Sequence, residues 1–582
     1  MGDVKKAPCY QCRCRKVRCD RREGGCCNCE RLEFICSYQR PKLSQKSDLP
    51  MYGGRDATQV PPERRRTRRA CIECHRQKMR CSGGLPACAS CIERRRKCYY
   101  PEDESTPTEK TQKPSLGMQS SVSGSMMSYL APEVILRVDQ FFEHLYPIPL
   151  YSFLHEPSIR RKLAEGSLNQ TLAFSLAALA SACFSNDHNQ TTLWLNTVEM
   201  EIWKSLDRPN IILLQSLILA LHCHIQRKCF PRAYLLAGLA SRTAIALRLN
   251  YERLDLSFIA QEIRRRVLWA LSFLDVIFAV GIPDHEFMPY SIIYQQLPTS
   301  ETLFYQGISE GAIACRIDST EGCSILGACL QLSKLSRDII RLKRQLALAE
   351  SPLENLESIV QEFQKCLWHL HKDVASSFNY QMSSTDQLEE MLESRWFLRY
   401  LQLTLMWHQA HCDLYRLFIP THPDSAPNII TDNVEVAFKA NAVKACITHS
   451  EEIHVIFSKL ESMPRRLAFP PSVAICAYQS TRLSLYLLHA SSLNGKVETS
   501  SFLAKADLSL TILRQLFICA TATEPIISDL ENIVKKAKSD PEIIEKEKED
   551  YHYRPEERLD RNTHLSVHSL MRQANFTDDG YE

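Results

Sequence analysis

The sequence lacks any hydrophobic run long enough to span a bilayer. Its longest mostly apolar segments, residues 171–184 and 211–223, are shorter than the roughly 20 residues that a spanning helix needs. It also lacks an apolar leader, since Met1 is followed by charged residues and then directly by cysteines, so we predict no signal peptide. These absences favour a soluble protein of a reducing compartment.

Catalytic signatures are absent as well. The chain contains no G-x-G-x-x-G, no G-x-x-x-x-G-K-[ST], no H-E-x-x-H and no G-x-S-x-G, so we do not expect an enzyme. One local group of metal-binding residue types, His222, Cys223, His224 and Cys229, lies in an apolar helical segment. Histidines and cysteines in such surroundings are usually part of the core, and we expect that here.

The low net charge conceals an uneven distribution. The formal charge is only +4 over 582 residues, yet the first 100 residues hold 25 Lys and Arg against 10 Asp and Glu. The other 482 residues hold 46 basic against 57 acidic residues. A basic N-terminal part joined to an acidic body predicts an anionic partner at one end only, and nucleic acid fits best.

Cysteine is abundant and concentrated near the N-terminus. Fourteen of the 25 cysteines lie between residues 9 and 98, and twelve of these form the pattern C-x2-C-x6-C-x6-C-x2-C-x6-C twice, displaced by 62 residues. The two sets are Cys9, Cys12, Cys19, Cys26, Cys29 and Cys36, and Cys71, Cys74, Cys81, Cys88, Cys91 and Cys98. The N-terminal part is therefore an internal duplication.

Six thiolates per copy suit two zinc ions. Two tetrahedral ions need eight ligand positions, and six sulfurs fill eight positions if two of them bridge both ions. We therefore predict two Zn²⁺ per copy and four in total. All twelve cysteines are predicted to be ligands.

On these residues the sequence resembles the fungal Zn2Cys6 binuclear zinc cluster transcription factors. The resemblance is carried by Ala70 to Cys81 with the later cysteines of the second copy, and by Cys9 to Asp20 with those of the first. It implies that the first and fourth cysteines of each copy bridge the metals. It also implies that Lys16 and Lys78 read a CGG triplet in the major groove. Nearby arginines would hold phosphates, and the candidates are Arg13, Arg15, Arg18, Arg76 and Arg80.

The copies depart from the family pattern at several positions. The first copy has two surplus cysteines, Cys14 and Cys27, and Cys27 could compete with Cys26 for metal, although the 62-residue offset favours Cys26. The second copy has His75 and Gln77 where the family usually has basic residues. Either copy could therefore be the weaker reader. The alternative for each is a zinc-stapled module that binds protein.

The expected fold class is two small zinc-stapled modules followed by a large all-α regulatory domain. We predict an N-terminal tail at 1–8, the modules at 9–38 and 71–100, a flexible basic linker at 39–70, a disordered linker at 101–128, the helical domain at 129–530 and a charged, disordered tail at 531–582. The basic run at 64–69 is typical of a nuclear import signal or a phosphate-binding arm.

No coiled coil is predicted after the second module, because residues 101–128 contain prolines and serines without a heptad repeat. Relatives in the family usually obtain two readers by pairing through such a coiled coil. Our hypothesis is that the duplicated module supplies both readers in one chain. The alternative is a homodimer formed through the helical body.

The body resembles the middle homology region of the same fungal regulators over roughly residues 135–290. The resemblance implies a regulatory role, with coactivators or corepressors and a small-molecule effector as expected partners. Glu262, the arginines at 264–266 and Asp275 could bind an anionic effector, but we expect internal salt links between helices instead. We read the chain as a nuclear regulator of RNA polymerase II genes that reads CGG-type triplets. The alternative is a zinc-stapled, effector-sensing or protein-binding scaffold that does not read DNA.

Overall fold

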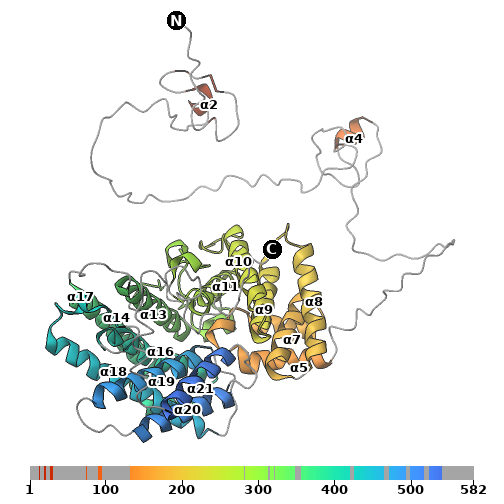
Figure 1. Cartoon of the computed structure of the whole chain (residues 1–582). Helices are drawn as coiled ribbons and strands as arrows, with labels where there is room; N and C mark the ends of the chain where they lie inside the picture. Colours follow the sequence, from red (N-terminus) through yellow and green to blue (C-terminus); the bar gives the residue numbers. More distant parts are fainter. Residues whose placement is uncertain are drawn as a thin grey trace, which may run out of the picture. The chain divides into compact units, whose positions relative to one another are not determined.

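The computed structural model divides into two compact units, residues 1–120 and 121–582 (Figure 1). In the second unit the structure describes residues 132–539 except 186, 281, 312–314, 320–321, 348–354, 420–421, 423–424, 464–470, 493–498 and 517–522. In the first unit it describes residues 12, 19, 20, 22, 26–30, 74 and 89–94.

The described residues of the second unit are mostly helical and include no strand. The α-helices of its first half are α5 (Pro132–Gln140), α6 (Glu156–Ala164), α7 (Gln170–Phe184), α8 (His188–Lys204), α9 (Ile211–Gln226), α10 (Phe230–Ala246), α11 (Phe258–Ile277) and α12 (Glu301–Gln306). Those of its second half are α13 (Ile325–Ala347), α14 (Leu356–Phe378), α15 (Thr385–Glu390), α16 (Phe397–Tyr415), α17 (Asn428–Thr431), α18 (Val436–Glu461), α19 (Pro471–Ser492), α20 (Thr499–Leu516) and α21 (Glu524–Ser539). Short turns of other helix types are η2 (Phe141–Leu145, a π-helix) and the 3-10 turns η3 (Pro149–Tyr151), η4 (Pro283–His285), η5 (Tyr290–Ile292) and η6 (Arg416–Phe418).

Helices α7 and α9 form the centre of the first half because their sequences are apolar on every side. From Leu213 to Ile225 every residue of α9 is buried, and α9 packs against α7, α8 and α10. Polar residues fix where these helices begin. Asn169 and Asn210 accept hydrogen bonds from the backbone N–H three residues later, at 3.0 Å in both cases, which caps α7 and α9.

Helix α16 has the same central position in the second half. It packs against α13, α18 and α19, and α18 in turn packs against α19 and α20 (Figure 1). The buried apolar side chains of both halves form one continuous core that runs from α5 to α21. We therefore treat the second unit as a single folding body.

A buried ion network ties the two halves of this body together. Glu301 at the start of α12 accepts hydrogen bonds from Arg266 of α11 at 2.8 Å and from Arg399 of α16. Arg399 also donates to the Ser152 hydroxyl at 2.7 Å and to the Pro147 carbonyl at 3.0 Å. Since both arginine side chains are fully buried, this network fixes the segment between η2 and α6 against α11, α12 and α16.

The sequence placed the end of the helical domain at residue 530, and this boundary is wrong. Helix α21 continues to Ser539, so nine residues that were assigned to a charged tail are helical. The reason is the spacing of Ile526, Leu530 and Val534, which are all buried and repeat every fourth residue. The remaining predicted tail, 540–582, lies outside the described residues, as do the predicted linkers.

Candidate zinc-cluster sites

The first module brings cysteine sulfurs together around a short helix. Helix α2 (Cys27–Glu30) begins directly after Cys26, whose carbonyl accepts hydrogen bonds from the N–H groups of Cys29 and Glu30 at 3.0 Å. The sulfurs of Cys12, Cys26 and Cys29 lie within 4.8 Å of one another, and all three side chains are fully buried. Cys12 therefore meets two cysteines that lie 14 and 17 positions later in the sequence.

The distances suit zinc. Two sulfurs bound at about 2.3 Å to one tetrahedral ion lie about 3.8 Å apart. The Cys12 and Cys26 sulfurs are 3.5 Å apart, close to that separation. Buried thiols form only weak hydrogen bonds with one another, so their contact stabilises the fold little. As thiolates, all of them could bind one shared Zn²⁺.

Cys26 is the common member of two groups. Besides the group with Cys12 and Cys29, its sulfur lies within 4.8 Å of the Cys19 sulfur and of an Asp20 carboxylate oxygen. A sulfur that belongs to both groups occupies the position that a ligand shared between two ions would need. This placement supports the bridging role that the resemblance implies for Cys26.

Cys27, the competing cysteine, is placed differently. Its side chain is exposed, and its backbone N–H donates to both carboxylate oxygens of Asp20 at 3.2 Å. Hydrogen bonds from the Cys27 thiol and backbone hold the pKa of the Asp20 carboxyl below its ordinary value. The sequence did not single out Asp20, because its contact with Cys27 spans seven residues and belongs to no motif.

The second module repeats this arrangement where it is described. Helix α4 (Ala89–Glu93) begins 62 residues after α2, and the sulfurs of Cys74 and Cys91 are buried and 4.0 Å apart. These two cysteines correspond by the same offset to Cys12 and Cys29. Ala89 stands at the position of Cys27, so the second copy forms the same helix without a cysteine there.

The other predicted site residues lie outside the described residues. They are the ligands Cys9, Cys36, Cys71, Cys81, Cys88 and Cys98, and the DNA-contacting candidates Arg13, Arg15, Lys16, Arg18, Arg76, Lys78 and Arg80. Their roles stay predictions.

Three members of the candidate group, His222, Cys223 and His224, lie buried in α9, as expected, whereas Cys229 lies beyond this helix and the expectation is wrong for it. His224 is buried against Glu199 at 2.5 Å, and Arg232 holds the same carboxylate at 2.9 Å. His222 packs edge-on against the Tyr151 ring, and burial lowers its pKa to about 3. Cys229 is exposed at the end of the segment. Within the part of the chain that the structure describes, metal-capable groups of three occur only in the first module.

The charged residues of α11 make internal links, which confirms the expectation from the sequence. Glu262 accepts from Arg265 at 2.6 Å and from Arg266 at 2.8 Å. Asp275 accepts from Arg337 of α13 at 2.9 Å. Arg264 donates to two backbone carbonyls at the end of α10, at 3.0 Å each.

Comparison with known families agrees with this geometry. The fungal Zn(2)-Cys(6) binuclear cluster domain matches twice, at residues 7–45 and 69–107, and the fungal specific transcription factor domain matches residues 138–400. The chain belongs to the fungal Zn2Cys6 transcription factors. Members of this family bind zinc through the cluster and are transcription factors, not enzymes.

Several curated proteins are similar over part of their length. The Zn(2)-C6 fungal-type transcription factor FTF1c of Fusarium oxysporum f. sp. lycopersici is 30% identical over 29% of this chain and 20% of its own length. FTF2 of the same organism is 24% identical over 44% of this chain and 34% of its own. An uncharacterized transcriptional regulatory protein of Schizosaccharomyces pombe is 25% identical over 32% of this chain and 21% of its own. The matched regions thus span about a third or less of these relatives.

No solved structure matches the chain. Among the helices that the structure describes, none is long and apolar enough to cross a membrane.

Proposed function

We propose that the chain is a zinc-dependent, sequence-specific DNA-binding regulator of RNA polymerase II transcription that acts in the nucleus. Its two zinc clusters would read two CGG-type triplets. The observation that supports this most directly is the duplicated convergence of buried cysteine sulfurs, because it predicts two metal-stapled modules within one basic segment. Homology to fungal transcription regulators supports the same reading.

Each residue class has its own task in this proposal. The twelve predicted cysteines, four of them bridging, would hold four Zn²⁺, and the metal would supply rigidity to modules too small to build an apolar core. Lys16 and Lys78 would donate to guanine O6 and N7 in the major groove. The five arginines beside them would fix the position on the phosphates.

The domain limits predicted from the sequence are part of the same proposal, with the helical end moved to Ser539. The helical body would have the regulatory role, with a small-molecule effector and coactivators or corepressors as its partners. We propose that one chain supplies both readers, since two modules of one design precede a single body.

Selection of bound sequences from random duplex DNA tests the proposal. The full chain with Zn²⁺ should enrich two CGG-like triplets at fixed spacing, and removing Zn²⁺ with a chelator should abolish the enrichment. A single enriched triplet would show that one module does not read DNA or that a second chain is needed. No enrichment would favour the protein-binding scaffold.

Lysine variants separate reading from charge. Lys16→Ala and Lys78→Ala should each relax specificity at one triplet by about tenfold, because one good bidentate base contact is worth roughly 1–3 kcal/mol. Lys46→Ala, which removes the same charge from the linker, should leave specificity unchanged. If all three variants behave alike, the lysines contribute only charge.

A further inference from the structure

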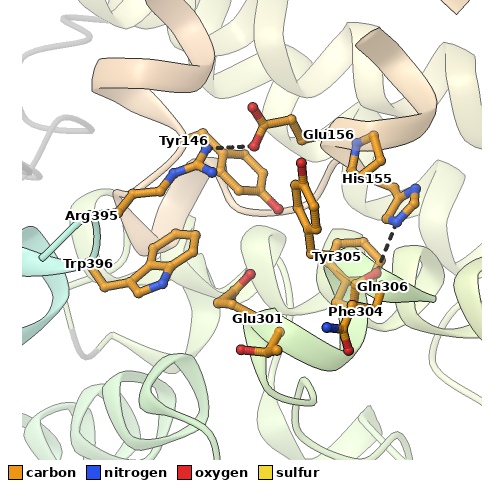
Figure 2. Close-up of a pocket in the computed structure, with 11 residues that line it drawn as sticks. Tyr146, His155, Glu156, Glu301, Phe304, Tyr305, Gln306, Arg395 and Trp396 are labelled. Carbon is orange, nitrogen blue, oxygen red and sulfur yellow. Dashed lines mark hydrogen bonds and ion pairs between the residues drawn. The ribbon is translucent and has the colours of Figure 1, made fainter. Parts of the chain in front are cut away.

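A pocket of about 290 Å³ opens on the body beside the buried ion network (Figure 2). Three segments far apart in the sequence form it. They are the start of α6 with Tyr146 before it, the length of α12, and the pair Arg395 and Trp396 that precedes α16. His155 joins two of these segments, because one ring nitrogen lies 2.9 Å from the Phe304 carbonyl oxygen.

The walls of the pocket are largely aromatic. Figure 2 shows Tyr146, Tyr305, Phe304 and Trp396 around the same space. Aromatic walls favour a flat, unsaturated ligand that can lie against the rings. A volume at the lower end of the range for ligand sites limits that ligand to one or two fused rings with a substituent.

A cationic ligand fits these rings poorly, because guanidinium groups already lie over them. Arg399 lies 4.1 Å from the centroid of Trp396, and Arg266 lies 4.2 Å from that of Phe304. Arg395 lies 5.7 Å from the Tyr146 ring and 5.2 Å from the Trp396 ring. An ammonium group would therefore meet like charge at the faces that usually attract it.

Two carboxylates line the pocket, and each is held by two arginines. Glu156 accepts from Arg160 at 2.7 Å and from Arg395 at 2.6 Å. Glu301 is held by the two buried arginines of the ion network. Burial alone would raise the pKa of the Glu301 carboxyl, but these guanidinium groups hold this pKa below its usual value. Neither carboxylate presents uncompensated negative charge to a ligand.

We propose that this pocket binds a small planar organic carboxylate. The rings would enclose its flat part, and the partly exposed guanidinium of Arg395 would face its carboxylate. Glu156 would act as a positioning residue, because its ion pair holds Arg395 at the edge of the pocket (Figure 2). The proposal assigns a chemical class to the effector. That this ligand regulates the protein rests on the proposed function, whereas its binding can be measured directly.

Isothermal titration calorimetry of the zinc-loaded full chain tests the proposal, with 2-naphthoate as the probe. We expect saturable binding at one site. The neutral isostere 2-naphthamide should bind at least about tenfold more weakly, because a charge-assisted hydrogen bond is lost. Octanoate, which carries the charge without the planar rings, should also bind more weakly. Equal binding of all three probes, or no saturable binding of naphthoate, would overturn the proposal.

Variants locate the site. Arg395→Gln should weaken naphthoate binding at least about tenfold. Tyr305→Ala should weaken it several-fold, and because this side chain is 55% exposed the fold does not depend on it. Arg161→Gln, an exposed arginine of α6 outside the pocket, is the matched control. Unchanged binding in both pocket variants would place the naphthoate elsewhere and reject this pocket.

The same preparation separates this inference from the proposed function. If the zinc-loaded chain binds naphthoate but does not bind DNA, only the DNA-reading proposal is contradicted. If it binds DNA but does not bind naphthoate, only the proposal for the pocket is contradicted.

Discussion

Cys26 and Cys27 show how one residue step separates a proposed metal ligand from its neighbour. Both are cysteines, yet Cys26 is fully buried among other sulfurs while Cys27 is exposed at the first position of α2. The duplication alone favoured Cys26, since the 62-residue offset maps it onto Cys88 and maps Cys27 onto Ala89. The contact between Asp20 and Cys27 could not be foreseen, because it depends on how the chain folds around the sulfurs.

We predict that Cys26→Ser and Cys27→Ser differ sharply in zinc content. Cys26→Ser should lower the zinc bound per chain by about one to two ions, because the ligand that we propose to be shared would be lost from both metal positions. Cys27→Ser should leave the content unchanged. Native mass spectrometry or atomic absorption of the purified chain gives the count. A loss of zinc in Cys27→Ser equal to that in Cys26→Ser would contradict the assignment.

At the scale of elements, the sequence predicted helices well and their partners poorly. The all-α body was predicted correctly, and α10 carries Pro231 in its first turn, a position that proline favours. The ion network could not be predicted, since Arg399 reaches Glu301 across 98 residues and Ser152 across 247. Sequence patterns record local spacing, whereas such pairs depend on how distant helices pack.

The ion network predicts a large cost for removing Glu301, the carboxylate that pairs with both Arg266 and Arg399. Glu301→Gln should lower the free energy of unfolding of the body by about 3–5 kcal/mol, because Arg399 stays buried without its carboxylate partner and Arg266 keeps only Glu262, which it shares with Arg265. Urea unfolding followed by circular dichroism measures the change. Asp255→Asn, which breaks the exposed pair with Arg253, serves as the control and should leave stability unchanged. A similarly small effect of Glu301→Gln would show that the network does not stabilise the body.

A histidine cluster where α14, α16 and α18 meet predicts acid sensitivity. His408 faces His449 with ring nitrogens 2.9 Å apart, the rings of His411 and His449 stack at 4.1 Å, and His371 stacks on Trp407. Burial lowers the pKa of His408 to about 3 and of His449 to about 4, and it lowers that of His411 as well. These imidazoles are therefore neutral in the folded body at pH 7.

The sign of the pH effect follows from these depressed values. The unfolded chain protonates its histidines near pH 6.5, while the folded cluster resists protonation until pH 3 to 4, so stability falls as pH drops below about 6.5. Between pH 7 and 5 each such histidine should cost about 2 kcal/mol. The double variant His408→Gln/His411→Gln should reduce the pH dependence of the free energy of unfolding, as measured in urea. His188→Gln, at an exposed histidine, is the control and should leave this dependence unchanged. An unchanged slope in the double variant would show that other groups cause the acid sensitivity.

At the scale of the whole molecule, the two units rely on different sources of stability. The body has one continuous apolar core from α5 to α21, whereas the described residues of the first unit include a separate small cluster made of cysteines. A cluster of that size buries too little apolar surface to offset chain entropy without metal. The metal-capable groups in the described residues all belong to this first unit.

Zinc removal should therefore unfold one unit and spare the other. After treatment with 1,10-phenanthroline, we expect DNA binding and zinc-dependent structure to be lost. The main thermal transition of the helical body should shift by less than about 2 °C, because its large core is stabilised by apolar burial. Differential scanning calorimetry of the full chain measures this, with Cys26→Ser in the presence of zinc as a chelator-free counterpart. A shift of many degrees in the body transition would show that the modules and the body stabilise each other. In that case effector binding in the pocket and metal binding in the modules would be energetically linked, because any ligand that favours one folded unit would then favour the other.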